Sequence, residues 1–256
     1  MLETRSLTVR FGGHVAVNDV SCSYAPGTLT AIVGPNGAGK TTYFNLISGQ
    51  LRASSGTVRL EGRDLTPLGA AARMHAGLGR AFQLTQLFPR LSVHENVRLA
   101  LQSRRQGTGW RQIRFWRTWN ADRGLIERAD MLLARTRLSA RRDQHAADLP
   151  HGDQRKLEIA MLVALEPRVF MFDEPTAGMS VDDVPVVLEL IREIKSDPSK
   201  TILLVEHKMD VVRELADRIV VLHNGRLMAD GEPAAVIASP IVQQAYLGLG
   251  PAETAA

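Results

Sequence analysis

One short run of residues constrains the fold of this chain more than any other feature. Gly34-Pro-Asn-Gly-Ala-Gly-Lys-Thr41 matches the glycine-rich pattern in which backbone N–H groups cradle a phosphate. The apolar residues 28–33 before it predict a buried strand, and residues 40–48 after it predict a helix that Gly49 ends. A strand, a phosphate loop and a helix in this order predict an α/β fold that binds a nucleotide.

The residues of this phosphate loop have separate expected tasks. Glycine lets the backbone curl so that several N–H groups point at one phosphate, and the helix N-terminus adds positive potential. Lys40 is placed to reach the β- and γ-phosphates, and the Thr41 hydroxyl is placed to bind Mg²⁺. The residues expected to contact the nucleotide here are Asn36, Gly37, Ala38, Gly39, Lys40, Thr41 and Thr42.

An acidic pair follows another apolar run. Residues 169–172 are apolar, and Asp173 and Glu174 come directly after them. We expect Asp173 to hold Mg²⁺ through water and Glu174 to polarise an attacking water. Taken alone, an ordinary strand end explains this run equally well, but beside a phosphate loop it indicates nucleotide hydrolysis.

Two further residues gain meaning only from this context. His207 follows the strand-like residues 201–206, where an imidazole could contact the γ-phosphate or order the attacking water. A histidine at a strand end is more often structural, and Gln83 carries no signal by itself.

Strand-like and helix-like segments alternate through most of the chain, which predicts a mostly parallel sheet covered on both faces. The arginine-rich middle is expected to form an inserted helical subdomain. The other predicted strands are 6–11, 56–60, 201–205 and a hairpin of 219–222 with 226–229 through Asn224-Gly225. The other predicted helices are 68–75, one beginning at the capping box Ser92-Val-His-Glu95, 110–119, 125–138, 184–195 and 209–216.

The overall composition is that of an ordinary globular protein. The 256 residues, 45% of them hydrophobic, suffice for one domain with a sizeable core. The single cysteine, Cys22, has no internal disulfide partner, which favours a reducing compartment. We see neither a signal-peptide pattern nor an apolar run of the roughly 20 residues that span a bilayer, so work at a membrane would need the spans of partner proteins.

The positive charge is concentrated in one segment. Residues 98–142 hold 12 arginines and 3 acids, a net +9, whereas the remaining 19 basic and 24 acidic residues give −5. The three tryptophans, Trp110, Trp116 and Trp119, lie within this segment among arginines. This composition suits an anionic membrane surface or a loop of a membrane partner, and an ordinary helix with inward tryptophans and solvated arginines explains it as well.

The order and spacing of Lys40, Gln83, Asp173-Glu174 and His207 resemble those of the ATP-binding-cassette ATPases over essentially the whole chain. The resemblance implies an α/β fold with a P-loop (RecA-like) core and an N-terminal antiparallel β subdomain. It implies a single domain over residues 1–250, with the α-helical subdomain inserted at about 91–165 and a flexible tail at 251–256.

The same resemblance implies roles for particular residues, with ATP and Mg²⁺ as cofactors. Glu174 becomes the catalytic base, His207 the switch histidine, and Gln83 a glutamine that senses Mg²⁺ and the transmembrane partner. Phe11 is expected to stack on adenine with Val17 nearby. The implied metal site consists of Thr41, Gln83 and Asp173.

The family's signature motif departs from its usual Leu-Ser-Gly-Gly-Gln here. The motif acts across a dimer, where it contacts the γ-phosphate bound by the other subunit. Pro150, at the usual serine, lacks both a hydroxyl and an N–H, so we suspect that this chain pairs with a different ATPase subunit. Ser180 stands where related chains carry aspartate or asparagine, which alters the loop that meets the partner. The signature residues are Leu149, Pro150, His151, Gly152, Asp153 and Gln154.

Narrower motifs resemble the importers of branched-chain amino acids and their urea and amide relatives. They are Phe11-Gly-Gly-His-Val-Ala-Val-Asn-Asp-Val20, Arg80-Ala-Phe-Gln83, His151-Gly-Asp-Gln154, Ala177-Gly-Met179, Glu206-His207 and Ala245-Tyr246-Leu-Gly248. The expected function is the ATP-hydrolysing subunit of such an importer. Uptake of urea, amides or aromatic acids remains the alternative, with lipopolysaccharide export less favoured because the arginine-rich insert resembles those ATPases less.

This resemblance implies specific partners. They are two transmembrane permeases, a second ATPase subunit arranged head to tail in a homodimer or a heterodimer, and indirectly an extracytoplasmic solute-binding protein. These partners imply a place at the cytoplasmic face of the membrane. A nucleic-acid role is disfavoured, because the chain has one phosphate loop, one cysteine and no heptad run. A subunit that binds ATP without hydrolysing it is disfavoured because Glu174, Gln83 and His207 are all present.

Overall fold

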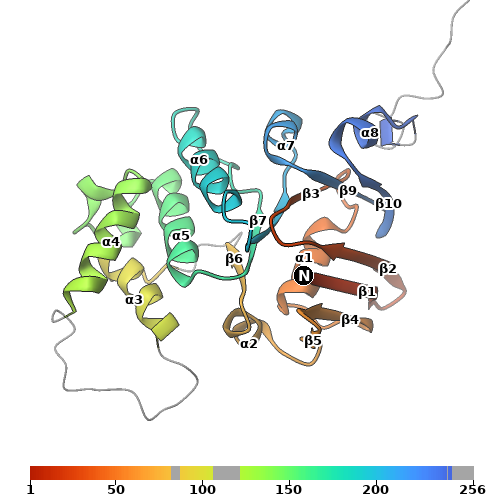
Figure 1. Ribbon diagram of the computed structural model, residues 1–256, viewed down its shortest axis with the longest axis horizontal. Coiled ribbons are helices and arrows are strands. Elements are labelled where there is room, and N and C mark those ends of the chain that lie inside the picture. The colour runs from red at the N-terminus through yellow and green to blue at the C-terminus, as the bar shows by residue number, and fades with distance from the viewer. Residues whose placement is uncertain (82–86, 106–121, 241, 244–256) are drawn as a thin grey trace, which may run out of the picture. The chain divides into compact units, whose positions relative to one another are not determined.

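The computed structural model (Figure 1) describes residues 1–81, 87–105, 122–240 and 242–243. Contacts divide the chain into two units. Unit 1 comprises Met1–Leu78, Arg168–Glu174 and Lys195–Ala256, and unit 2 comprises Gly79–Pro167 and Pro175–Ile194. The helical segment expected at 91–165 falls within unit 2, which also includes residues 175–194.

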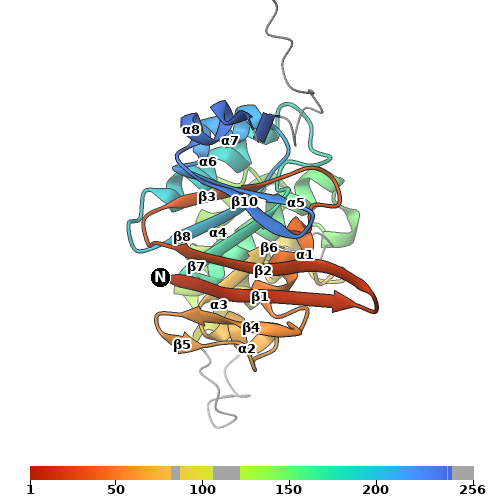
Figure 2. The same cartoon turned by 90° about the vertical axis from the view of Figure 1, so that its right-hand side faces the viewer.

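Unit 1 contains an antiparallel sheet with strand order β2-β1-β4-β5. Its long strands β1 and β2 run side by side with β4 in Figure 2. Strand β2 was not predicted, although Val20, Cys22 and Tyr24 alternate with exposed residues and are all buried. That period of two is the pattern of a strand with one face on the core. The strands are β1 (Leu2–Phe11), β2 (His14–Tyr24), β4 (Ser55–Leu60) and β5 (Arg63–Asp64).

The second sheet of unit 1 has the order β10-β9-β3-β8-β7, followed by β6 where the chain leaves the unit. Strands β9, β3, β8 and β7 are parallel, and β10 returns antiparallel to β9 as the predicted hairpin. Every residue of β3, β7 and β8 is buried, as expected for parallel strands covered on both faces. The strands are β3 (Leu29–Val33), β6 (Leu78–Ala81), β7 (Val169–Asp173), β8 (Thr201–Val205), β9 (Arg218–His223) and β10 (Arg226–Gly231).

Helices of unit 1 cover both faces of this sheet. Ile32 of β3 packs into one core cluster with Phe44 of α1, while its neighbours Ala31 and Val33 pack into another with Val212 of α7. Helix α1 has the predicted bounds, whereas α8 was not predicted and begins with a proline, a favoured first helical residue. The helices are α1 (Lys40–Ser48), α2 (Ala70–His75), α7 (Met209–Leu215) and α8 (Pro233–Ala238).

Unit 2 is helical around its own core cluster, to which α3, α4 and α5 contribute. The predicted capping box is present, because the Ser92 N–H donates to Glu95 (2.7 Å) and the Glu95 N–H donates to the Ser92 hydroxyl (3.1 Å). The helices are α3 (Val93–Arg105), α4 (Arg123–Arg135), α5 (His151–Leu165) and α6 (Val184–Lys195).

Helix α4 ends at Arg135, three residues before the predicted end. Arg137 adopts a left-handed φ of 56°, and the Leu138 N–H then donates back to the Leu133 carbonyl (2.7 Å). This is the closing turn that terminates many helices. The helix predicted at 110–119 and the tryptophan cluster lie outside the described residues.

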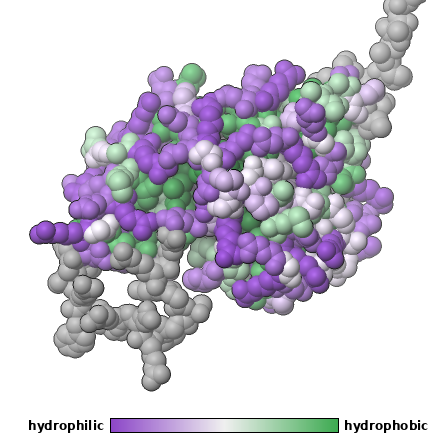
Figure 3. Space-filling model, in the orientation of Figure 1, coloured by the Kyte–Doolittle hydropathy of each residue, from purple (hydrophilic) through white to green (hydrophobic). Residues whose placement is uncertain are grey.

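None of the described helices is both long and apolar enough to cross a membrane. On the face shown in Figure 3, hydrophilic residues cover much of the described surface, with hydrophobic residues scattered among them. Isolated exposed apolar side chains are normal on a protein surface.

One buried side chain joins α1 and α2. The Arg73 guanidinium donates to the carbonyl oxygens of Leu46 (2.7 Å) and Ile47 (2.7 Å), beside Gly49 at the end of α1. It also donates to the carbonyl oxygens of Leu68 (2.9 Å) and Thr66 (3.1 Å). Since Arg73 is 3% exposed, its removal would leave buried acceptors without a donor.

We therefore expect Arg73→Met to lower the free energy of unfolding by about 3 kcal/mol, because buried unsatisfied carbonyls are costly. Urea titration followed by circular dichroism measures this. The control is Arg168→Met, which removes the exposed ion pair with Glu61 and should cost less than about 1 kcal/mol. Equal effects of the two substitutions would contradict a stabilising role for the hydrogen bonds of Arg73.

Candidate active site

The phosphate loop lies between β3 and α1 in unit 1, and its backbone requires glycine at two points. Gly34 and Gly39 have φ values of 154° and 95°. A Cβ at Gly34 would lie 2.1 Å from the Leu222 carbonyl oxygen, and one at Gly39 would lie 2.5 Å from the Ala16 carbonyl oxygen. Any side chain there would force the loop open, so the curled backbone depends on these glycines.

Lys40 is held inside the loop by the backbone of the loop. Its Nζ donates to the carbonyl oxygens of Gly34 (2.6 Å) and Pro35 (2.9 Å), and the residue is 6% exposed. Burial lowers the pKa of Lys40, while the negative charges of Glu174 and Asp173 act in the opposite direction. The ammonium group therefore lies close enough to the acidic pair to interact with it.

The acidic pair occupies the end of β7. Asp173 is the last residue of the strand and is 1% exposed. Glu174 follows with a left-handed φ of 49°, and its N–H donates to the Val205 carbonyl of β8 (2.9 Å). This turn directs Glu174 away from the strand and leaves its side chain partly exposed.

Glu174 and His207 meet although 33 residues separate them. Their Oε1 and Nε2 atoms lie 2.9 Å apart. The parallel pairing of β7 and β8, with Asp173 opposite Val205, brings the two strand ends to the same edge of the sheet. The His207 side chain is also partly exposed, so the pair faces solvent and can contact a bound substrate.

Sequence reasoning missed the part played by Glu206. Its Oε2 accepts from the backbone N–H of His207 (2.9 Å) and of Lys208 (3.3 Å). The residue is 3% exposed, and it fixes the turn that carries His207 from β8 towards α7. The available signal was an acid directly after the apolar strand.

The residues present fit a magnesium ion. The described residues contain no group of three or more His, Cys, Asp or Glu side chains that could hold a metal. Mg²⁺ commonly uses one or two carboxylates with phosphate oxygens and water. Asp173 and the half-buried Thr41 offer a carboxylate and a hydroxyl of that kind, while Gln83 lies outside the described residues.

The two residues expected near adenine differ in exposure. Phe11 ends β1 and is 50% exposed, which leaves its ring free to stack on a base. Val17 is fully buried and lies beside Gly39 of the phosphate loop. Val17 thus packs against the phosphate loop at Gly39.

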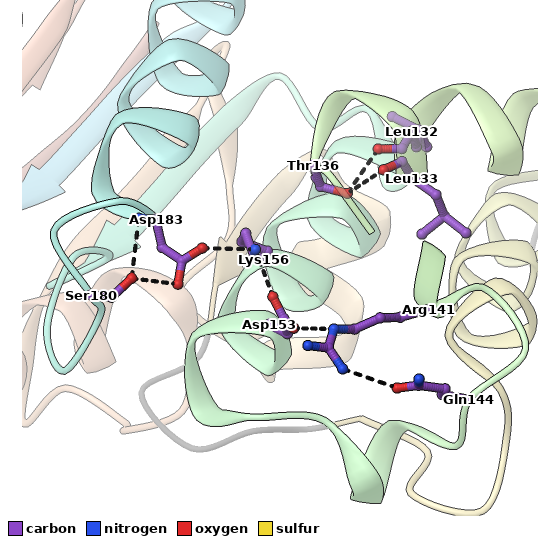
Figure 4. Close-up of polar contacts among 9 residues, drawn as sticks. All are labelled: Leu132, Leu133, Thr136, Arg141, Gln144, Asp153, Lys156, Ser180 and Asp183. Carbon is purple, nitrogen blue, oxygen red and sulfur yellow. Dashed lines mark hydrogen bonds and ion pairs between the residues drawn. The ribbon is translucent and has the colours of Figure 1, made fainter. Parts of the chain in front are cut away.

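The signature residues belong to unit 2, where they form the start of α5. Pro150 is the N-cap residue and supplies no side-chain hydrogen bond to the helix. Leu149 is buried, and its carbonyl accepts from the Gln154 side chain (2.9 Å). Figure 4 shows Asp153 turned to Arg141 and Lys156 instead of to solvent. His151, Gly152 and Asp153 are the first three residues of α5. Backbone N–H groups in the first turn of a helix have no partner within the helix.

Comparison with known proteins shows the family to which the chain belongs. Residues 17–177 match the ABC transporter family. The chain is 36% identical to the high-affinity branched-chain amino acid transport ATP-binding protein LivG of Escherichia coli, over 97% of this chain and 98% of LivG. It is 32% identical to the lipopolysaccharide export system ATP-binding protein LptB of Acidithiobacillus ferridurans, over 97% of each chain.

A solved ATP-binding cassette of an ABC transporter in its ADP conformation has a similar fold. The TM-score is 0.80 at 30% sequence identity, covering 97% of this chain and 99% of the cassette. The phosphate loop and the acidic end of β7 both lie within the matched residues. The chain therefore belongs to the ABC transporter family and is an ATPase of that family, with the two-sheet P-loop fold that the sequence predicted.

Proposed function

We propose that this chain is the ATP-hydrolysing subunit of an importer for branched-chain amino acids or related small solutes. The contact between Glu174 and His207 at the end of β7 and β8 (2.9 Å) carries the hydrolytic part of the proposal. The solute class rests on similarity to LivG over nearly the whole chain. A lower similarity to LptB keeps lipopolysaccharide export as the second candidate.

In this proposal each side chain has one task during hydrolysis. Lys40 neutralises charge on the β- and γ-phosphates, and Thr41 and Asp173 would hold Mg²⁺, which would supply further positive charge at the phosphates. Glu174 accepts a proton from the attacking water. His207 orients the Glu174 carboxylate through its Nε2 atom, which lies 2.9 Å from Glu174 Oε1.

The proposed assembly contains two ATPase subunits, two permeases and an external solute-binding protein. Each ATP site would combine the phosphate loop of one subunit with the signature of the other, at the cytoplasmic face of the membrane. Pro150 offers the partner's nucleotide neither a hydroxyl nor an N–H. Pairing with a different ATPase subunit therefore suits this chain better than pairing with itself.

The test is reconstitution in proteoliposomes with the permeases, a candidate partner ATPase and the external solute-binding protein, using leucine, urea, an aromatic acid and lipopolysaccharide as substrates. We expect ATP-dependent leucine accumulation and a higher ATPase rate in the complex than in the isolated chain. Accumulation of urea or the aromatic acid would assign the importer to that solute instead of leucine. Movement of lipopolysaccharide would make the transporter an exporter. Full activity of a tight ATP-bound homodimer would refute the mixed pairing.

A further inference from the structure

A buried lysine connects two segments of unit 2 that the proposed assembly would turn towards the partner subunit. Lys156 lies in the second turn of α5, and its side chain is only 6% exposed. Its Nζ lies 2.6 Å from Asp153 Oδ1 and 2.9 Å from Asp183 Oδ1. Figure 4 shows this ammonium group between the two carboxylates.

Each carboxylate has a second partner. Asp153 Oδ2 lies 2.6 Å from Arg141 Nε, and Arg141 in turn donates to Gln144 (3.3 Å). Asp183 Oδ2 accepts from the Ser180 hydroxyl (2.8 Å). The hydrogen bonds from Lys156 and Ser180 lower the pKa of Asp183, so this carboxylate stays charged at neutral pH.

The network joins the signature turn, residues 149–154, to the partner loop, residues 177–180. Two close approaches support the same connection. A Cβ at Gly152 would lie 2.9 Å from Asp183 Oδ2, and a Cβ at Gly178 would lie 3.4 Å from the His151 ring. The retained glycine of the signature thus makes room for the carboxylate that Lys156 holds.

We propose that Lys156 is a positioning residue that locks the signature turn and the partner loop into one rigid surface. Neither segment can shift alone, because that would leave a buried charge without its partner. The Ser180 hydroxyl donates to Asp183, so the unusual residue of the partner loop is part of the same hydrogen-bond network. The role during ATP-driven pairing rests on the proposed function, whereas the coupling of the two segments does not.

Amide hydrogen exchange of the nucleotide-free protein tests the coupling. Two groups of amides report it: Gln154 N–H, which donates to the Pro150 carbonyl (3.0 Å), and the N–H groups of Asp183 and Val184, which donate to the Ser180 carbonyl (3.1 and 3.2 Å). We expect Lys156→Met and Asp183→Asn each to speed exchange in both groups at least about tenfold. Lys156→Arg should retain most of the protection.

The control is Lys200→Met in unit 1, where Lys200 lies 3.9 Å from Asp197. It should leave both groups of amides unchanged. Faster exchange at Gln154 alone in Lys156→Met, or at Asp183 and Val184 alone in Asp183→Asn, would overturn the proposal. Equal acceleration of every amide in unit 2 would also overturn it, because Lys156 would then stabilise the whole unit instead of joining two segments.

A second measurement separates this inference from the proposed function. In a Glu174→Gln background we expect Lys156→Met to weaken ATP-dependent association with the partner ATPase at least about tenfold, with unchanged MgATP affinity of the isolated chain. Unchanged association would overturn the role in pairing. If the Glu174→Gln parent itself associates with no ATPase subunit, the proposed assembly fails, and the exchange data still decide the coupling.

Discussion

Glu174→Gln is expected to lower kcat for ATP hydrolysis by about 10²–10⁴-fold, the usual contribution of a positioned general base. The amide keeps the size of the carboxylate and can still meet His207 Nε2, now 2.9 Å from Glu174 Oε1, but it accepts a proton from water poorly. Binding of MgATP should be nearly unchanged, because the proposal assigns the phosphate contacts to Lys40 and the loop backbone.

Single-turnover hydrolysis and equilibrium ATP titration, on the isolated chain and on the complex, measure the two quantities. Glu61→Gln serves as the control, since Glu61 is exposed and pairs with Arg168. A Glu174→Gln variant that hydrolyses ATP at the wild-type rate would remove Glu174 as the base. If the wild type also fails to hydrolyse ATP in the complex, the site formed by the phosphate loop of this chain binds the nucleotide without hydrolysing it.

Lys40→Met should weaken MgATP binding at least about 100-fold, because charge-assisted hydrogen bonds contribute roughly 1.5–3 kcal/mol each. The ammonium lies over the loop carbonyls of Gly34 and Pro35, poised to turn towards a phosphate. Methionine keeps an unbranched apolar side chain, one atom shorter than that of lysine, and offers no donor.

Isothermal titration with a slowly hydrolysed ATP analogue measures this affinity. Lys200→Met is the control, because Lys200 lies 3.9 Å from Asp197 in an ion pair away from the loop. Wild-type affinity in Lys40→Met would mean that the backbone N–H groups alone bind the phosphates. Thermal unfolding of the nucleotide-free variant distinguishes lost binding from lost folding.

Local patterns were sufficient for much of the fold. The loop glycines, the buried parallel strands and the bounds of α1 and α6 followed from residue type and spacing. Strands β2, β5 and β6 and helix α8 were missed. Strand β2 derives its stability from pairing with β1 along almost its whole length, and α8 from packing Val236 on a core cluster of unit 1. Such long-range burial overrides weak local propensity.

The sequence by itself determined which chemistry this protein carries: a phosphate loop, an acid pair and a histidine, in an order that resembles one family. Only the tertiary structure decided which of these groups touch. The register of β7 on β8 brings Glu174 to His207, and the packing of unit 2 inserts Lys156 between Asp153 and Asp183. Separation along the chain says nothing about such contacts, because strand pairing and side-chain burial set them.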